Sequence, residues 1–248
     1  MSQRIRIGVI VPSTNTTCEA DFQMTAPRHV TVHGQRMWLT NDAAGEASME
    51  RMNAEIESGA RYLATAKVDL VAYGCTTGSF YKGPGWDAEM LTLLEREAGV
   101  PAVATSPAVV EALRFLGVNK LSVASPYPEW NNTKLLAYLE AVGFEVLNVA
   151  GDPMAAKTGN QGINDQSPER VVEFASSVCR PEAEALFCSC TAWRSVEAVE
   201  ALEQRLGKPV VSSNQAMIWA AFRKLGIREP IQGFGSLLAS LATTAVSA

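Results

Sequence analysis

The sequence predicts an α/β fold made of two similar lobes, each built on a parallel sheet, with the active site in the cleft between them. Short apolar segments that are typical of buried strands alternate with longer segments of helical spacing. The two halves of the chain also repeat the same landmarks in the same order, which indicates an internal duplication. In each half a buried strand ends at a cysteine, Cys75 in the first and Cys190 in the second.

The first half is predicted from the spacing of its apolar residues. Arg4 and Arg6 alternate with apolar residues in an opening strand that Pro12 ends. Glycines at 78, 83 and 85 mark a loop after the third strand. The predicted strands are 4–11, 30–39, 68–74 and 100–104, and the predicted helices are 48–66, 87–98 and 107–116.

The second half begins at Lys120 and repeats this alternation. Residues 151–166 are rich in Gly, Asn and Asp and are predicted to form a loop. The predicted strands are 121–125, 144–149, 184–189 and 209–212, the predicted helices are 130–142, 168–178, 195–206 and 215–225, and a short helix closes the chain after Gly233. We expect an N-terminal lobe at 1–117 and a C-terminal lobe at 118–248, with a tail able to pack back on the first lobe.

The duplication predicts where the two cysteines lie. Pro12 matches Pro126, Cys75 matches Cys190, and Pro101 matches Pro209. Two lobes related by a pseudo-twofold axis would bring equivalent strand ends face to face, at the carboxyl edge where open α/β sheets bind ligands. Cys75 and Cys190 are therefore expected to flank one cleft.

The composition excludes several classes of protein. The formal net charge is −5, and the sequence has no long basic run of the kind that binds nucleic acids. It also has no apolar stretch of about 20 residues, the length that spans a membrane. The opening strand does not resemble a signal peptide, so we expect a cytoplasmic protein with five free thiols. Neither histidine lies near the cysteines, and no Cys-x-x-Cys, Walker or G-x-G-x-x-G motif occurs. We expect no metal and no cofactor.

Two facing thiols suit proton chemistry on a carbon held between them. One thiol can remove a proton while the other donates one. Alternatively, one thiol can attack the substrate covalently while the other donates and accepts protons. Backbone N–H groups at the strand ends predict a lowered thiol pKa. Neutral donors in the same loops, which include Asn15, Thr76, Thr77, Tyr127 and Thr191, would bind substrate carboxylates.

The same residues resemble the aspartate/glutamate racemase superfamily over about residues 4–236. The segment Val11-Pro12-Ser13-Thr14-Asn15-Thr16-Thr17, the paired cysteines and Pro126-Tyr127 resemble its maleate cis-trans isomerase branch. The resemblance implies that Cys75 is the nucleophile and Cys190 the proton donor and acceptor. It also implies that Asn15, Tyr127 and an asparagine in the middle loop contact the substrate. Asn160 is the best match for that asparagine, and Asn164 competes with it.

Other features resemble a different branch. Thr76-Thr77-Gly78-Ser79 and the segment 205–213 are similar to arylmalonate decarboxylases, which use one cysteine, matching Cys190, and have glycine where this chain has Cys75. The Gly-Cys-Thr sequence is also similar to ectoine-utilisation relatives of the isomerases. The presence of Cys75 favours an isomerase or racemase over a decarboxylase.

Each candidate also has a plain structural interpretation. Cysteine is commonly a small buried apolar residue, and asparagine or threonine at these positions can cap a helix. A carboxylate-binding protein without turnover and a redox sensor are alternatives from other classes. The first needs no thiols, and the second needs sulfurs closer than a substrate cleft allows. We therefore expect an isomerase that acts on a small carboxylate and forms a dimer or tetramer.

Overall fold

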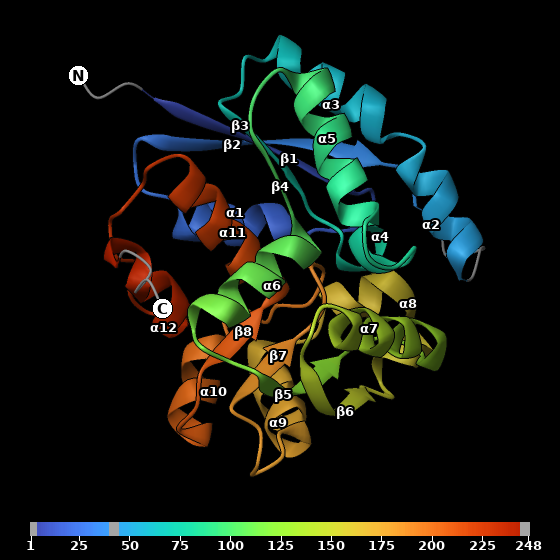
Figure 1. The fold of residues 1–248 in the computed structure, drawn as a ribbon, viewed down its shortest axis with the longest axis vertical. Helices are drawn as coiled ribbons and strands as arrows, with labels where there is room; N and C mark the ends of the chain where they lie inside the picture. Colours follow the sequence, from blue (N-terminus) through green and yellow to red (C-terminus); the bar gives the residue numbers. More distant parts are fainter. Residues whose placement is uncertain (1–3, 40–44, 244–248) are drawn as a thin grey trace.

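The computed structural model describes residues 4–39 and 45–243, and the statements below concern these residues. Two four-stranded parallel sheets have the strand orders β2-β1-β3-β4 and β6-β5-β7-β8, so the second sheet repeats the first with every strand number raised by four. Figure 1 shows the first sheet above the second, with helices around both. The predicted α/β class with two parallel-sheet lobes is confirmed.

The strands and helices have the following bounds. The strands are β1 (Ile5–Pro12), β2 (Val30–Met37), β3 (Leu70–Tyr73), β4 (Ala102–Ala104), β5 (Lys120–Ser125), β6 (Glu145–Gly151), β7 (Ala185–Cys188) and β8 (Val210–Ser212). The helices are α1 (Cys18–Thr25), α2 (Glu46–Asn53), α3 (Ile56–Thr65), α4 (Thr76–Phe80), α5 (Trp86–Ala98), α6 (Thr105–Phe115), α7 (Glu129–Ala141), α8 (Ala155–Asn164), α9 (Pro168–Val178), α10 (Val199–Leu206), α11 (Ser213–Lys224) and α12 (Gly235–Ala239), followed by the 3₁₀ turn η1 (Ser240–Ala242).

The segments that carry the two cysteines are hydrogen-bonded in the same way to the central strands β1 and β5. The N–H of Gly74 donates to the carbonyl of Ile10 at the end of β1, at 2.7 Å. In the second sheet the N–H of Ser189 donates to the carbonyl of Ala124 on β5, at 2.8 Å. Each cysteine is the next residue after the one that makes this hydrogen bond. The two cysteines therefore occupy equivalent positions in the two sheets.

The inner strands are apolar because helices cover both faces of each sheet. Every residue of β3 and β7 is buried, and so is β1 from Ile7 onward. Such continuous burial removes the alternation of exposed and buried residues, as expected for parallel strands. These runs are the reason that the strand ends could be located from sequence.

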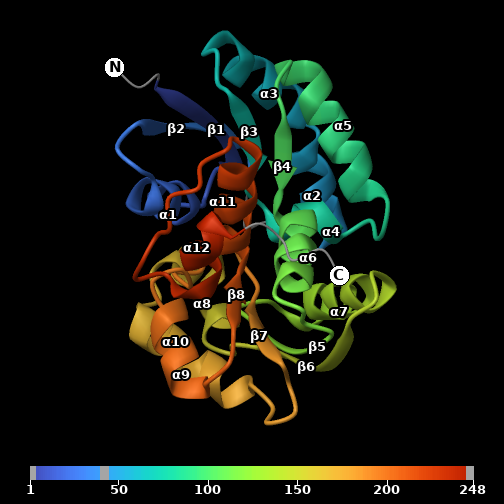
Figure 2. The same cartoon turned by 60° about the vertical axis from the view of Figure 1, so that its left-hand side comes forward.

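Helices α6 and α11 join the two halves. They pack against each other, and α11 also contacts α1 and β4 of the first half while α6 contacts β8 of the second. Figure 2 shows α11 lying between α1 and α6. The closing helix α12 contacts α10, α11 and β8.

Besides the short helix α4, which contains Gly78 where a loop is predicted, three elements differ from the sequence prediction. The helix predicted at 48–66 is two helices, α2 and α3, separated by a turn at Ala54 and Glu55 whose helical dihedral angles hardly disturb the apolar spacing. The loop predicted at 151–166 contains α8, a largely exposed helix kinked at Gly159, where φ is 63°. Its polar composition is that of a surface helix as much as of a loop, so composition alone could not separate them.

The third difference is helix α1, which was not predicted. Its start is organised by the side chain of Asn15, whose Oδ1 accepts hydrogen bonds from the N–H groups of Thr17 and Cys18, both at 3.0 Å. The helix spans only two turns and has little amphipathic spacing, because Asp21 is buried beside Phe22. A buried aspartate breaks the pattern from which helices are predicted.

Candidate active site

Cys75 occupies the N-cap position of α4. Its Sγ accepts a hydrogen bond from the N–H of Gly78 at 3.4 Å, and the residue is 7% exposed. Cys75 follows the last residue of β3 by two positions, and its extended backbone leads directly into the helix. The thiol therefore lies at the carboxyl edge of the first sheet.

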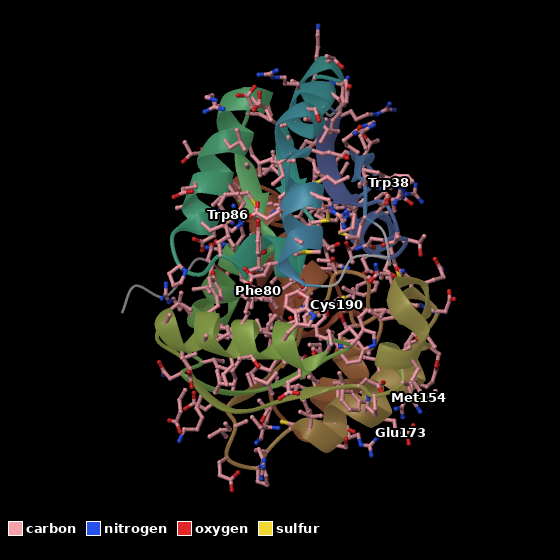
Figure 3. All side chains as sticks on the ribbon, turned by 90° about the vertical axis from the view of Figure 1, so that its right-hand side faces the viewer. Trp38, Phe80, Trp86, Met154, Glu173 and Cys190 are labelled. Atoms are coloured by element: carbon pink, nitrogen blue, oxygen red, sulfur yellow. The ribbon has the colours of Figure 1, made fainter. Side chains whose placement is uncertain are left out.

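Cys190 lies at the matching edge of the second sheet, two residues after β7. Its Sγ accepts a hydrogen bond from the N–H of Ala192 at 3.4 Å, and its own N–H donates to Ser213 Oγ at 3.1 Å. It is also 7% exposed. Figure 3 shows Cys190 near the middle of the molecule, between the elements of the upper and the lower sheet.

Both thiols line one cavity of about 400 Å³. Its wall combines hydroxyl and amide groups with a set of apolar side chains. The polar residues are Asn15, Thr76, Thr77, Tyr127, Asn131, Asn160 and Thr191, and the apolar ones include Pro12, Leu39, Met49, Pro126, Trp130 and Ile163. The structure thus brings both cysteines and the candidate donors Asn15, Thr76, Thr77, Tyr127, Asn160 and Thr191 to the same cavity, whereas Asn164 is not part of its wall.

Thr76 connects the two cysteine-bearing segments. Its hydroxyl donates to Ser213 Oγ at 2.9 Å, and the same oxygen accepts from the N–H of Cys190. Because Ser213 Oγ accepts both bonds, its own proton is left to point elsewhere. Thr77 is held from the opposite side, where Asn131 Nδ2 donates to its Oγ1 at 2.9 Å.

Asn15 and Thr191 link the first loop to the segment after Cys190. Asn15 Nδ2 donates to Thr191 Oγ1 at 3.0 Å, and the Thr191 hydroxyl donates to the carbonyl of Gly74 at 3.1 Å. Asn15 Oδ1 is already occupied by the start of α1. Asn15 is therefore a helix cap and a cavity residue at once, with its second Nδ2 proton left for a ligand.

The two competing asparagines of α8 have different places. Asn160 lines the cavity. The side chain of Asn164 is hydrogen-bonded to the backbone of the loop that carries Asn15. Its Oδ1 accepts from the N–H of Thr16 at 3.0 Å, and its Nδ2 donates to the carbonyl of Thr14 at 3.0 Å. Asn164 shapes the loop that carries Asn15, and Asn160 is the one of the pair that faces ligand space.

Burial raises the pKa of both thiols, contrary to the lowering expected from sequence. Desolvation is the largest cause, and it raises the pKa of Cys75 to about 12 and that of Cys190 to about 11. Hydrogen bonds from Gly78 to Cys75, and from Ala192 and Tyr127 to Cys190, lower these values only in part. Burial also holds the pKa of Tyr127 well above its usual value, so its hydroxyl remains a donor.

Alkylation should report this protonation state directly. Because only the thiolate reacts, the rate of Cys75 modification by iodoacetamide is expected to rise about tenfold per pH unit from about pH 7 to about pH 9, without a plateau. Peptide mapping by mass spectrometry would follow Cys75 and Cys190 separately, with Cys75→Ala isolating the second. A plateau below about pH 8 would mean that the N–H donors outweigh burial.

Two glycines let the backbone approach closely around Cys75. A Cβ on Gly78 would lie 2.0 Å from Tyr73 Oη, and that hydroxyl donates to Asn53 Oδ1 at 2.5 Å. A Cβ on Gly74 would lie 2.9 Å from Cys18 Sγ and 3.0 Å from Val11 Cγ1. The Gly-Cys-Thr-Thr-Gly sequence is thus explained by packing as well as by chemistry.

Gly78→Ala is expected to lower the free energy of unfolding by about 1–3 kcal/mol, because the new methyl group must displace the Tyr73 hydroxyl. Urea denaturation would measure the loss. The matched control is the double variant Gly78→Ala/Tyr73→Phe, in which the clashing oxygen is gone. Its loss should be smaller than the sum of the two single losses. Strict additivity would contradict the clash.

Sequence reasoning missed part of the cavity wall. Asn131 could have been found from its position four residues after Tyr127 at the start of a predicted helix. Leu39, Met49 and Ile163 lie on elements far apart in the chain and carry no local signal. In the part of the chain that the structure describes, no group of three or more His, Cys, Asp and Glu side chains could hold a metal ion. No helix within that part is long and apolar enough to cross a membrane.

The chain is similar to known proteins over most of its length. The family model described as arylmalonate decarboxylase matches residues 7–238. A maleate isomerase from Geobacillus stearothermophilus is 26% identical over 96% of this chain and 98% of its own. An arylmalonate decarboxylase from Bordetella bronchiseptica is 30% identical over 89% and 90%. The solved Nocardia farcinica maleate cis-trans isomerase, a cysteine-to-serine variant with a covalently bound succinylcysteine intermediate, superposes with a TM-score of 0.87 at 26% identity, covering 95% of this chain and 98% of that one.

Proposed function

The chain belongs to the arylmalonate decarboxylase family, and from that premise we propose that it isomerises a small cis-dicarboxylate, maleate to fumarate or a close derivative, without a cofactor. The observation that carries the proposal is the pair of thiols, Cys75 and Cys190, at equivalent strand ends on one cavity. The isomerase relatives and the succinylcysteine intermediate of one of them support this reaction.

In the proposed mechanism the reactive form has lost one thiol proton to solvent, so that Cys75 is a thiolate and Cys190 a thiol; because burial raises both pKa values, this form is a minor population at neutral pH. The Cys75 thiolate adds to one alkene carbon, and the π electrons move to the other carbon and its carboxylate. The Cys190 thiol gives that carbon its proton, which leaves a succinyl thioether on Cys75 and a thiolate on Cys190. After rotation about the new single bond, Cys190 takes a proton back and the C–S bond breaks. All atoms and electrons are returned, so the cycle is balanced.

The neutral donors of the cavity would hold the two carboxylates. We assign this role to Asn15, Thr76, Thr77, Tyr127, Asn160 and Thr191. Neutral donors suit an enediolate, because they stabilise developing charge without forming an ion pair with the ground state. The raised pKa of Tyr127 keeps its proton available for such a bond.

Decarboxylation of a substituted malonate is the second candidate. The apolar wall formed by Leu39, Met49, Trp130 and Ile163 favours it, because a bare four-carbon dicarboxylate offers little apolar surface to such a wall. The arylmalonate decarboxylase relative supports the same choice. A racemase would use the same two thiols. Cys75 favours the isomerase or the racemase, because protonation of a decarboxylated enediolate needs only one thiol.

Proton NMR in D₂O separates these reactions. With maleate, wild-type protein is expected to produce fumarate, and deuterium on the fumarate carbons would show exchange at the proton-carrying thiol. Unchanged maleate together with CO₂ release from an arylmalonate would replace the isomerase proposal by the decarboxylase. Deuterium entering a chiral carboxylic acid with loss of optical rotation would indicate a racemase.

We also propose that the protein works in the cytoplasm as a dimer or tetramer on a small carboxylate. The five cysteines are all free, which fits a reducing compartment. Light scattering on the purified protein would give the assembly state.

A further inference from the structure

A buried carboxyl group lies behind the cavity and plays no part in the mechanism above. Asp21, on α1, is 2% exposed, and its Oδ2 accepts a hydrogen bond from Asn214 Nδ2 at 2.7 Å. Asn214 is the second residue of α11 and is fully buried. The contact therefore joins two helices that are far apart in sequence and lie side by side in Figures 1 and 2.

The amide of Asn214 is incompletely paired. Its two N–H groups are used, one by Asp21 and one by the carbonyl of Thr191 at 2.8 Å. Its Oδ1 is buried and has no donor within the described residues. An unpaired buried carbonyl is costly, so a missing proton is the natural explanation for it. Among the described residues, Asp21 is the acidic group that is hydrogen-bonded to this amide.

The surroundings of Asp21 favour the protonated acid. The hydrogen bond from Asn214 and the charge of Arg194 favour ionisation, and the charge of Glu197, before α10, opposes it. On α1 itself, Cys18 faces the carboxyl group one turn earlier, while Glu19 is paired with Arg36 of β2. Burial is the largest influence and raises the pKa of Asp21 to about 8.

We propose that Asp21 is a carboxylic acid whose O–H donates to Asn214 Oδ1 while Asn214 Nδ2 donates back, and that this acid–amide pair positions the segment that carries Cys190. All donors and acceptors of Asn214 are then satisfied. The adjacent residues of α11 hold the segment at two points, because Ser213 Oγ accepts from the Cys190 N–H and Asn214 Nδ2 donates to the Thr191 carbonyl. Asp21 is a positioning residue and does not touch the substrate.

The pair gives stability a defined pH dependence. The folded protein keeps the Asp21 proton up to about pH 8, whereas the unfolded chain releases it near the ordinary value of 3.8. Between these values folding takes up a proton, so this contribution to stability falls as the pH rises and levels off above about pH 8. Asp21→Asn offers the same two hydrogen bonds through an amide that does not titrate.

Urea unfolding of wild type and Asp21→Asn over about pH 5 to about pH 9 tests the proposal. The unfolding equilibrium constant of wild type is expected to rise relative to that of Asp21→Asn, by up to about tenfold per pH unit, with the change ending above about pH 8. Asp21→Leu, which removes both hydrogen bonds, should be less stable than either at every pH. An Asp21→Asn protein that is much less stable than wild type at about pH 6 would mean that Asp21 is ionised, and would overturn the proposal.

Two further measurements keep the test independent of folding of the variants and of the proposed function. Carbon NMR of wild type labelled at the aspartate carboxyl groups should show one that stays protonated at about pH 6, and an ionised Asp21 there would overturn the pairing. If maleate is a substrate, kcat of wild type should decline above about pH 8 relative to Asp21→Asn, with KM little changed. A pH-independent ratio would leave the pair as a structural contact and overturn its positioning role. Absence of turnover would overturn only the isomerase proposal, since the unfolding and NMR results stand without it.

Discussion

Alanine at position 75 is expected to lower the isomerase kcat by at least about 10⁴-fold, because the covalent route requires a nucleophile at this position. Of the described cysteines, only Cys75 and Cys190 line the cavity. Cys190 approaches the cavity from the opposite sheet, and its N–H is anchored to Ser213. Proton NMR of maleate would measure the loss, and titration of maleate by calorimetry would show whether binding survives.

The control for Cys75→Ala is a thiol outside the cavity. Cys179 is partly exposed and does not line the cavity, so Cys179→Ala should keep wild-type turnover. Cys75→Ser keeps the size of the side chain and its place at the start of α4, yet a hydroxyl is a far weaker nucleophile. Turnover within tenfold of wild type in Cys75→Ala would show that no adduct forms on this residue, and general acid–base chemistry alone would have to explain the reaction.

Replacing Cys190 by serine is expected to lower kcat by about 10²–10⁴-fold, the usual range for loss of a general acid or base. The distinguishing result is the species that accumulates. With Cys75 intact, addition to maleate can proceed using a proton from water, but the reverse proton removal is slow. Intact-protein mass spectrometry after incubation with maleate should therefore show a mass increase of one dicarboxylate, and peptide mapping should place it on Cys75.

The matched control for this variant is the last residue of β7. Cys188, two residues earlier, is fully buried and is not part of the cavity wall. Cys188→Ser should cost stability, because it buries a hydroxyl in an apolar core, and should neither slow the chemistry nor trap an adduct. An adduct on Cys190 in the Cys75→Ser protein, and none on Cys75 in the Cys190→Ser protein, would reverse the two roles.

The elements that could be predicted are those whose burial produces a recognisable pattern of apolar residues along the sequence. Strands β3 and β7 are buried on both faces and form continuous apolar runs, so the sequence predicts their carboxyl ends to within one residue of Tyr73 and Cys188, where the structure ends them. Helix α8 is mostly exposed and rich in Gly and Asn, and helix α1 buries an aspartate. The glycines and polar residues of α8 are typical of a loop, and the buried aspartate breaks the apolar spacing of α1, so neither helix is predicted from the sequence.

The protonation state of the two thiols could not be predicted from the sequence, and the reason is related. The local signal at Cys75 is a helix start with an N–H pointing at the sulfur, and this favours the thiolate. The opposing effect is desolvation by burial, which depends on how segments distant in the chain pack around the thiol. The pKa of Cys75 depends on both effects, and the sequence around Cys75 reveals only the first of them.

The packing of α6 on α11 makes the two halves dependent on each other for folding. A fragment ending at 117 would expose the face of α6 that α11 covers, and a fragment starting at 118 would leave α11 without α1, β4 and α6. Each fragment would retain a complete four-stranded sheet, yet neither would keep its share of the common core. The chain should therefore melt as one cooperative unit, and its halves should regain structure only when mixed. An ancestral half-length protein would have met this requirement by pairing with a second copy of itself.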